Sequence, residues 1–313
     1  MTAAAIYIVA TVNGKGDIRI TLSAFLYTSL RFWPGFLTHE VMKKILLVYN
    51  AETYSEHLTR FALKLSRQTG ALLHAVFVSP LAQQISQYPF PGTLPLVASE
   101  LTGVEEIQRE RQHLVSSNID LFSTSCSEAG ILFKADSDID ITIEDVIDHS
   151  AFADLILFDA REQFGAYSFK DLLSDTHCPV ILVPENATTP QKAILCYDES
   201  FSSIYAIKQY GYLFPDWNDL PTYLLSINPK GDNGNKFDDY LDDWLPAHFS
   251  NLEKIELQGN LQTELTSYIK KDDSRSIVIM GAYGGNAVSR IFHRSLVNVV
   301  LEETSASVFV IHE

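Results

Sequence analysis

An internal repeat is the feature that most constrains how this chain can fold. The stretch KKILLVYNAETYSEHLTRFALKLSRQTGALLHAVFV starts at Lys43, and KAILCYDESFSSIYAIKQYGYLFPDWNDLPTYLLSIN starts at Lys192. Each contains an apolar run, a polar turn, an amphipathic helix and a second apolar run. Two further apolar runs recur in both halves: DLILFDA (154–160) with SIVIMGA (276–282), and PVILVPE (179–185) with SVFVIHE (307–313). The chain is therefore predicted to be a duplicated unit.

The pattern within each unit predicts an α/β fold. Short, continuous apolar runs alternate with helical stretches, which is typical of parallel strands covered on both faces. Strands are expected at 43–49, 71–78, 131–135, 154–159 and 179–183, and again at 192–197, 221–227, 253–257, 276–280 and 307–311. The polar segment NATTPQ separates the units, so domains are predicted over 42–185 and 192–313.

The first 41 residues have no counterpart in the repeat. Their early apolar stretch lacks a basic start, which argues against a secretory signal, and no apolar run in the chain reaches the roughly 18 residues of a membrane helix. We interpret residues 1–41 as a leader extension outside the fold, with MKKILLVYN at Met42 as the start of the first domain. A targeting or docking segment is the alternative.

Charge and cysteine content limit the classes of function. The net charge of −16 repels phosphate backbones and anionic lipid, so nucleic-acid and membrane-surface roles are not favoured. Cys126, Cys178 and Cys196 are far apart and form no CxxC pair. This usage indicates reduced thiols in a cytoplasmic protein rather than disulfides or a zinc site.

Three glycines follow the fourth apolar run of the second unit. Gly281, Gly284 and Gly285 lie in the expected strand-to-helix connection, and open α/β sheets bind ligands beyond the carboxyl ends of their strands. Glycines at this place let a phosphate reach backbone N–H groups near a helix start. A plain glycine-containing turn is the alternative.

Asp198 follows the first strand of the same unit. If the first and fourth strands are neighbours, Asp198 and Gly281 face one crevice, where a carboxylate accepts hydrogen bonds from a ribose hydroxyl or an adenine amine. The segment DESFSS is also a helix-start signal, so Asp198 capping the next helix is the alternative, with Ser200 or Ser202 as a further cap.

From Met42 to Glu313 the sequence resembles a tandem universal stress protein. The nucleotide motif of that family, G-x2-G-x9-G-[ST], aligns with Gly281, Gly284, Arg294 and Ser295, so that three of its four positions match. Asp198 aligns with the family's aspartate after the first strand. The resemblance implies two doubly wound, open, parallel five-stranded sheets, Rossmann-like and similar to the adenine-nucleotide alpha-hydrolases. It also implies an intrachain pseudo-dimer in which the last strands of the two units pair antiparallel.

The resemblance further implies a nucleotide pocket in the second unit. Cys196, Tyr197, Ile227 and Met280 would line the base and the sugar, while Ser295 and the N–H of Leu296 would meet the phosphates of ATP or a related adenine nucleotide, with Mg²⁺ accompanying it. Arg294 replaces a motif glycine. Its side chain would either obstruct the phosphate chain or bind it through the guanidinium group.

The first unit lacks these features. Asn50 replaces the aspartate, and of the glycine loop only Gly165 remains. Asp159 and Glu162 stand where phosphate would lie, and two carboxylates repel an anion there. We expect no ATP in this unit, and we interpret the two carboxylates as a solvated acidic loop rather than as a catalytic pair.

The sequence favours two functions from different classes. It shows no nucleophile–base signature, Walker motif or metal-ligand spacing, so we expect no catalytic or metal-binding residues and at most weak ATP hydrolysis. One hypothesis is a cytoplasmic stress-response regulator that binds a nucleotide in its second unit. The other is a nucleotide-free scaffold that binds protein partners and whose pocket Arg294 closes. A homodimer beyond the intrachain pseudo-dimer is compatible with both.

The repeat also predicts that the leader is dispensable. A chain that starts at Met42 keeps every element of both units, and we expect its melting temperature to equal that of the full chain. Differential scanning calorimetry of the two chains checks this. A drop of many degrees on truncation would show that residues 1–41 pack into the core.

Overall fold

The computed structural model describes residues 7–12, 18–23, 42–78, 101–138, 141–162, 173, 175–227, 238–270, 275–282 and 296–311. Contacts divide the chain into two compact parts, Met1–His39 and Glu40–Glu313, which are not the two repeats. The smaller part contains an antiparallel pair of strands, β1 (Tyr7–Val12) and β2 (Ile18–Ser23), which the sequence analysis did not predict. These two strands form a two-stranded sheet of their own.

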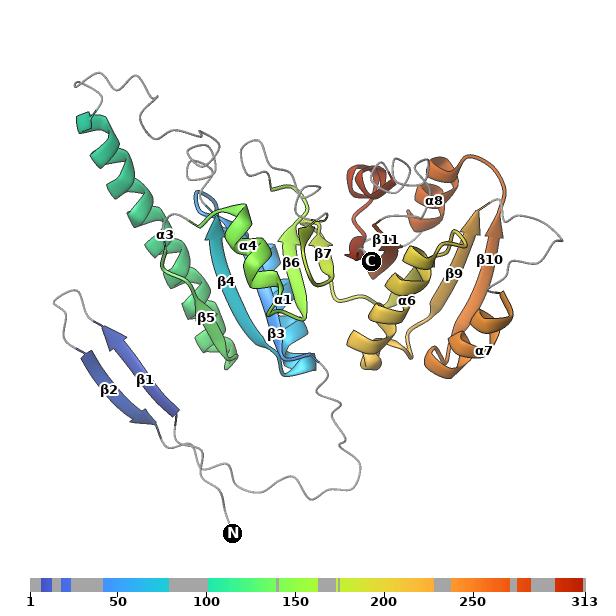
Figure 1. Cartoon of the computed structure of the whole chain (residues 1–313), viewed down its shortest axis with the longest axis horizontal. Helices are drawn as coiled ribbons and strands as arrows, with labels where there is room; N and C mark the ends of the chain where they lie inside the picture. The colour runs from blue at the N-terminus through green and yellow to red at the C-terminus, as the bar shows by residue number, and fades with distance from the viewer. Residues whose placement is uncertain are drawn as a thin grey trace, which may run out of the picture. The chain divides into compact units, whose positions relative to one another are not determined.

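The larger part, Glu40–Glu313, contains one ten-stranded sheet with two halves, and the strands within each half are parallel (Figure 1). The N-terminal half comprises β3 (Lys44–Asn50), β4 (Leu72–Val78), β5 (Phe133–Ala135), β6 (Leu155–Asp159) and β7 (Val180–Val183). The C-terminal half comprises β8 (Lys192–Cys196), β9 (Thr222–Ile227), β10 (Leu252–Leu257), β11 (Ser276–Gly281) and β12 (Ser307–Ile311). The strand order is β10-β9-β8-β11-β12-β7-β6-β3-β4-β5, so both halves have the same doubly wound topology.

The two halves meet through their last strands. β12 pairs antiparallel with β7, and Phe309 lies opposite Ile181. All other neighbouring strands of the ten-stranded sheet are parallel. The predicted pseudo-dimer is therefore confirmed, and the two five-stranded halves form one continuous sheet. Both strands are buried along their whole length, which explains why their sequences are apolar without alternation.

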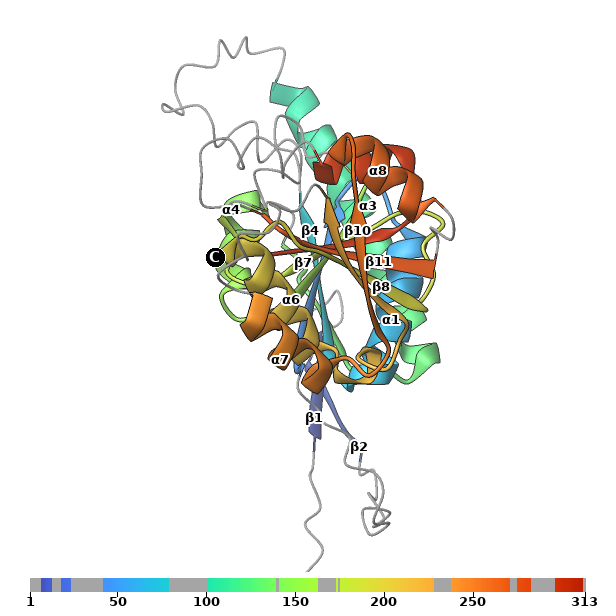
Figure 2. The same cartoon turned by 90° about the vertical axis from the view of Figure 1, so that its right-hand side faces the viewer.

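Helices cover both faces of this sheet (Figure 2). They include α1 (Glu56–Thr69), α3 (Leu101–Ala129), α4 (Ile143–Ser150), α6 (Phe201–Leu213), α7 (Asp238–His248), α8 (Leu261–Ile269) and the 3₁₀ turn η1 (Pro215–Trp217), and residues 296–303 are also helical. Residues of α1, α3, α6 and α7 belong to one hydrophobic cluster, and residues of α4 and α8 belong to the other. A serine caps the first helix of each half. The Ser55 side chain accepts a hydrogen bond from the N–H of Leu58 at the start of α1, and the Ser200 side chain accepts one from the N–H of Ser203 at the start of α6. Among the described residues, no helix has the length and apolar character needed to span a bilayer.

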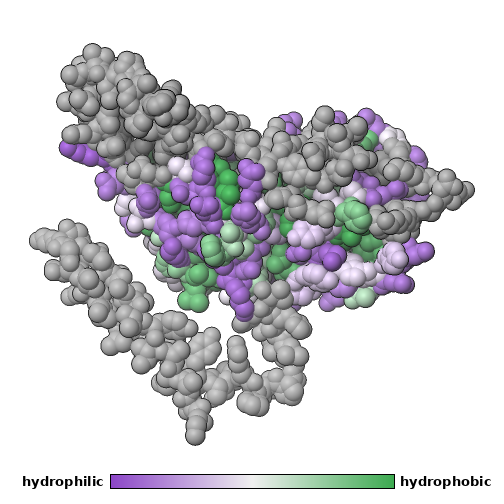
Figure 3. Space-filling view, in the orientation of Figure 1, coloured by the Kyte–Doolittle hydropathy of each residue, from purple (hydrophilic) through white to green (hydrophobic). Residues whose placement is uncertain are grey.

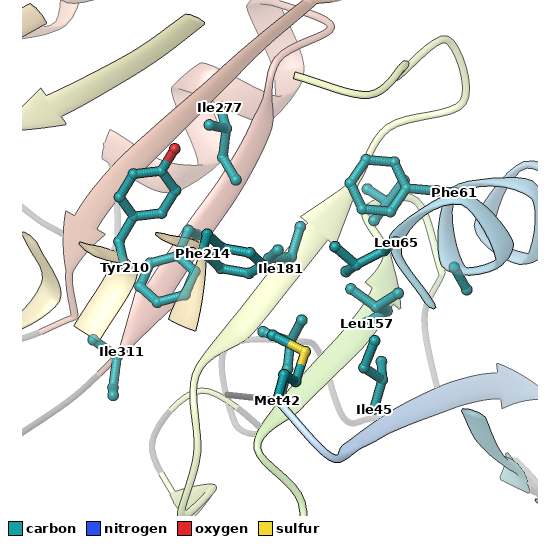
Figure 4. Packing of buried hydrophobic residues seen from close by; sticks show 14 of the residues in the cluster. Met42, Ile45, Phe61, Leu65, Leu157, Ile181, Tyr210, Phe214, Ile277 and Ile311 are labelled. Atoms are coloured by element: carbon teal, nitrogen blue, oxygen red, sulfur yellow. The ribbon is translucent and has the colours of Figure 1, made fainter. Parts of the chain in front are cut away.

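One hydrophobic cluster continues across the junction (Figure 4). Ile45, Leu157 and Ile181 come from the N-terminal half, and Tyr210 and Phe309 come from the C-terminal half, and all five are fully buried. The ring of Phe309 contacts Tyr210 and Phe214 at centroid distances of 5.9 and 6.1 Å. Because this core belongs to both halves, the halves are expected to unfold together.

Substitution of Phe309 by Ala tests this shared core. The cavity left behind should lower the free energy of unfolding by about 3–5 kcal/mol. Phe152→Ala is the matched control, because Phe152 is 81% exposed and its loss should cost less than about 0.5 kcal/mol. Urea unfolding followed by circular dichroism and tryptophan fluorescence measures both variants. We expect one coincident transition in the wild type, and two separate transitions would contradict the shared core.

Candidate functional site

Each half contains a point at which the strand order reverses. β8 is adjacent to β11, and β3 is adjacent to β6, as the sequence analysis required. In the C-terminal half, Asp198 follows β8 and Gly281 ends β11. The strand registers place Asn50 and Asp159 at the equivalent positions of the N-terminal half. Doubly wound sheets bind ligands at this reversal, so the two equivalent sites can be compared directly.

Asp198 lies in a tight turn between β8 and α6. Its Oδ1 accepts hydrogen bonds from the backbone N–H of Ser200, at 3.1 Å, and from the Ser200 hydroxyl. Glu199 between them has a φ of 63°, which is the left-handed region that non-glycine residues rarely adopt. The Asp198 side chain itself is exposed. Asp198 therefore fixes the start of α6, as the capping alternative stated, and Ser200 is the N-cap residue.

Gly281 has a structural reason to be glycine. A Cβ placed on it would lie 2.6 Å from the backbone carbonyl carbon and oxygen of Ser202, in the first turn of α6. Backbone atoms cannot move away as a flexible side chain can, so any side chain here would push α6 from β11. The first glycine of the motif is therefore needed for helix–strand packing, whether or not a ligand also approaches it.

The other described pocket residues lie around the same strand ends. Cys196, Met280 and Leu296 pack in one hydrophobic cluster, whereas Tyr197 belongs to the cluster on the opposite face of the sheet. Ile227 ends β9, the other neighbour of β8. Met280 is 1% exposed, so in this conformation its side chain belongs to the core. Gly284, Gly285, Arg294 and Ser295 lie outside the described residues.

The three cysteines are poor nucleophiles at neutral pH. All are free thiols, and burial raises the pKa of each to about 12, with nearby Asp198 contributing at Cys196. A thiol with such a pKa is neutral at pH 7 and is a poor nucleophile and metal ligand. Within the part of the chain that the structure describes, no cluster of His, Cys, Asp and Glu could hold a metal ion.

The equivalent position of the N-terminal half is filled by its own side chains. Asp159 Oδ2 accepts a hydrogen bond from the Ser55 hydroxyl at 2.9 Å and lies 3.1 Å from His57 Nε2. Its Oδ1 accepts from the backbone N–H of Arg161 at 3.0 Å. Burial alone would raise the pKa of Asp159, but hydrogen bonds from His57, Arg161 and Ser55 bring it below its ordinary value of 3.8.

The second carboxylate binds the loop after β3. Glu162 Oε2 accepts from the side-chain amide of Asn50 at 3.1 Å, and its Oε1 accepts from the Thr53 hydroxyl at 2.7 Å. The interpretation of a solvated acidic loop is wrong for Asp159, which is only 3% exposed. Its charge tolerates burial because three donors converge on it, which the sequence did not indicate.

Sequence reasoning missed Ser55 and His57 as site residues. Ser55 and Asp159 are 104 residues apart in the sequence. The motif SEH has the ordinary composition of a helix start, since serine caps helices and Glu56 suits the first turn. The usable signal was the replacement of the glycine by an aspartate, because a carboxylate at a buried strand end needs donors nearby.

Comparisons with known proteins support the fold. No protein-family model matches the sequence, and no match was found among curated proteins. A universal stress protein from Archaeoglobus fulgidus DSM 4304 aligns with a TM-score of 0.61 and 13% identity, over 86% of this chain and 96% of its own. A Burkholderia pseudomallei protein from the universal stress protein family aligns over 46% of this chain and 97% of its own, with 20% identity and a TM-score of 0.29.

A universal stress protein solved in complex with cAMP aligns over 40% of this chain and 99% of its own, with 17% identity and a TM-score of 0.28. The conclusion about the fold rests on the Archaeoglobus structure, because the alignment with it covers most of this chain and most of its own. Together with the two doubly wound halves described above, it shows that this chain has the fold of a tandem universal stress protein.

The pH dependence of stability tests the buried network of the N-terminal half. Because the pKa of Asp159 is lowered on folding, its carboxylate stabilises the fold above pH 4, and this stabilisation is lost as the pH falls through the lower folded pKa. Asp159→Asn should therefore cost about 1–3 kcal/mol at pH 7, and the difference from wild type should shrink below pH 4.

Urea unfolding between pH 7 and pH 3 measures this difference. Asp242→Asn is the control, because Asp242 forms an exposed ion pair with Lys254 and its loss should cost less than about 1 kcal/mol. Equal effects of the two substitutions at pH 7 would contradict a stabilising role for the buried network.

Proposed function

We propose that this chain is a cytoplasmic stress-response regulator of the universal stress protein class, whose C-terminal half binds ATP or a related adenine nucleotide. The difference between the two reversal points carries the proposal. In the C-terminal half the strand ends bear the exposed Asp198 and the small residues Gly281 and Ala282. In the N-terminal half the equivalents of Asp198 and Gly281 are Asn50 and Asp159. Both are bound by neighbouring side chains, Asn50 by Glu162, and Asp159 by Ser55 and His57.

Asp198 is the residue of this chain that would hold the nucleoside. A carboxylate accepts hydrogen bonds from ribose hydroxyls and from the adenine amine. Its bond from the backbone N–H of Ser200 fixes the orientation of the side chain before a ligand arrives, which reduces the entropy lost on binding. The phosphates would lie towards Gly284, Ser295 and the N–H of Leu296, as the motif implies, with Mg²⁺ accompanying them. The proposal assigns no catalytic residue.

A nucleotide-free scaffold remains the second candidate, and one observation favours it. Packing against Ser202 already requires Gly281 to be glycine, so this part of the motif would persist without a ligand. In that case Arg294 closes the pocket, and the ten-stranded sheet serves to present surfaces to protein partners. Mass spectrometry of small molecules released from the purified protein separates the two candidates. A near-stoichiometric adenine nucleotide supports the first, and nucleotide-free protein that ignores added ATP supports the second.

Paired substitutions at equivalent positions test the proposed site. Asp198→Ala should weaken ATP binding by about tenfold to a hundredfold, the size of a lost hydrogen bond to a charged group. Asn50→Ala removes the equivalent side chain of the N-terminal half and should leave the affinity unchanged. Isothermal titration calorimetry measures both variants, and their melting temperatures report on folding. Equal affinities for wild type and Asp198→Ala would refute the role of this carboxylate.

Two further substitutions examine the phosphate end of the site. Gly284→Val should abolish ATP binding, because a branched side chain blocks backbone access, and binding at unchanged affinity would refute the site. Arg294→Gly restores the full motif. Tighter binding by this variant shows that Arg294 obstructs the phosphates, whereas binding weaker by about 1.5–3 kcal/mol shows that the guanidinium group holds them. We expect obstruction, because the family's glycine marks a backbone contact.

A further inference from the structure

A hollow of about 600 Å³ lies between α6 and α7, apart from the residues assigned to the nucleotide. Its walls are apolar. The side chains that form them are Phe201, Ile204 and Ile207 from α6, and Tyr240, Leu241 and Trp244 from α7. Ile207 and Leu241 belong to the buried core, so the floor of the hollow is the core itself.

The rim exposes large aromatic side chains. Phe201 is 60% exposed and Tyr240 is 73% exposed. In Figure 3 green and near-white side chains gather on the right-hand part of the molecule, where α6 and α7 lie in Figure 1, among purple ones. Exposed aromatic residues around a concave apolar surface are typical of binding sites.

Two charged residues also line the hollow, and they differ in exposure. Lys208 on α6 is half-buried, and among the described residues it forms no ion pair or hydrogen bond. Asp243 on α7 is exposed and keeps its contact with water. Of the two charged residues, Lys208 is the one held closer against the hollow, and the complement of its ammonium group is an anion.

We propose that this hollow binds a small aromatic carboxylate. The volume lies in the range of small-molecule sites, about 300–1,000 Å³. The rings of Phe201, Tyr240 and Trp244 suit a flat aromatic body, and Lys208 suits its carboxylate. The site is independent of the proposed nucleotide site, because none of the residues assigned to the nucleotide lines it.

Isothermal titration calorimetry of the full chain with 2-naphthoate and 2-naphthamide tests the proposal. The two probes share one aromatic body and differ in charge. We expect 2-naphthoate to bind about tenfold more tightly than 2-naphthamide, as one charge-assisted contact provides. Lys208→Gln should remove this difference. Lys64→Gln makes the same change of charge on α1, away from the hollow, and should preserve it.

A second variant tests the place of binding. Ala247 lines the hollow from α7 and is exposed, so Ala247→Phe should fill the space and abolish binding of both probes without lowering the melting temperature. Binding by wild type that survives Ala247→Phe would overturn the assignment, as would equal affinities of the two probes or an equal loss with Lys64→Gln. Self-association of the wild type that Ala247→Phe abolishes, without probe binding, would show that a second copy occupies this face instead. Asp198→Ala should leave naphthoate binding unchanged, so this test can fail or succeed separately from that of the nucleotide site.

Discussion

The antiparallel pairing of β7 with β12 is the interaction on which the rest of the structure depends. Each is the last strand of its half and would otherwise leave an apolar edge unpaired, which invites aggregation. Pairing them places Ile181 against Phe309 and joins the two cores into one. Because the strands of one half run antiparallel to those of the other, the carboxyl ends of the two sets of strands point in opposite directions. The two reversal points are therefore remote from each other, and one can change without disturbing the other.

The two halves solve the same packing problem in different ways. In each half the end of the fourth strand meets the first turn of the first helix. The C-terminal half uses Gly281, which brings the backbone of Ser202 so close that no Cβ fits. The N-terminal half uses Asp159, which binds Ser55 and His57 in the same turn. A glycine at this point thus has two sufficient explanations, packing and ligand access, and the motif alone cannot separate them.

Most of the sheet could be predicted from the sequence, because strands buried on both faces are apolar runs that need no knowledge of their neighbours. All ten strands lie within two residues of their expected bounds, and the repeat indicated that β7 and β12 are equivalent. The network around Asp159 could not be predicted, because a carboxylate looks the same in sequence whether water or Ser55 and His57 solvate it. The hollow was missed for a related reason: Phe201 and Tyr240 come from helices whose distance apart depends on packing.

The two halves differ in the stability of the turn that follows their first strand. The turn after β8 carries an exposed carboxylate and, at Glu199, a left-handed conformation that costs on the order of 1 kcal/mol for a non-glycine residue. The conformation of Glu199 lowers stability, and a strained conformation persists where the surrounding structure determines it. The N-terminal half has the opposite character, since Asp159, His57 and Ser55 are buried and bonded to one another. Because one core joins both halves, the stability gained around Asp159 belongs to the same cooperative unit as the strained turn. The loss of the motif glycine from one repeat is therefore compatible with its retention in the other, where packing against Ser202 requires it.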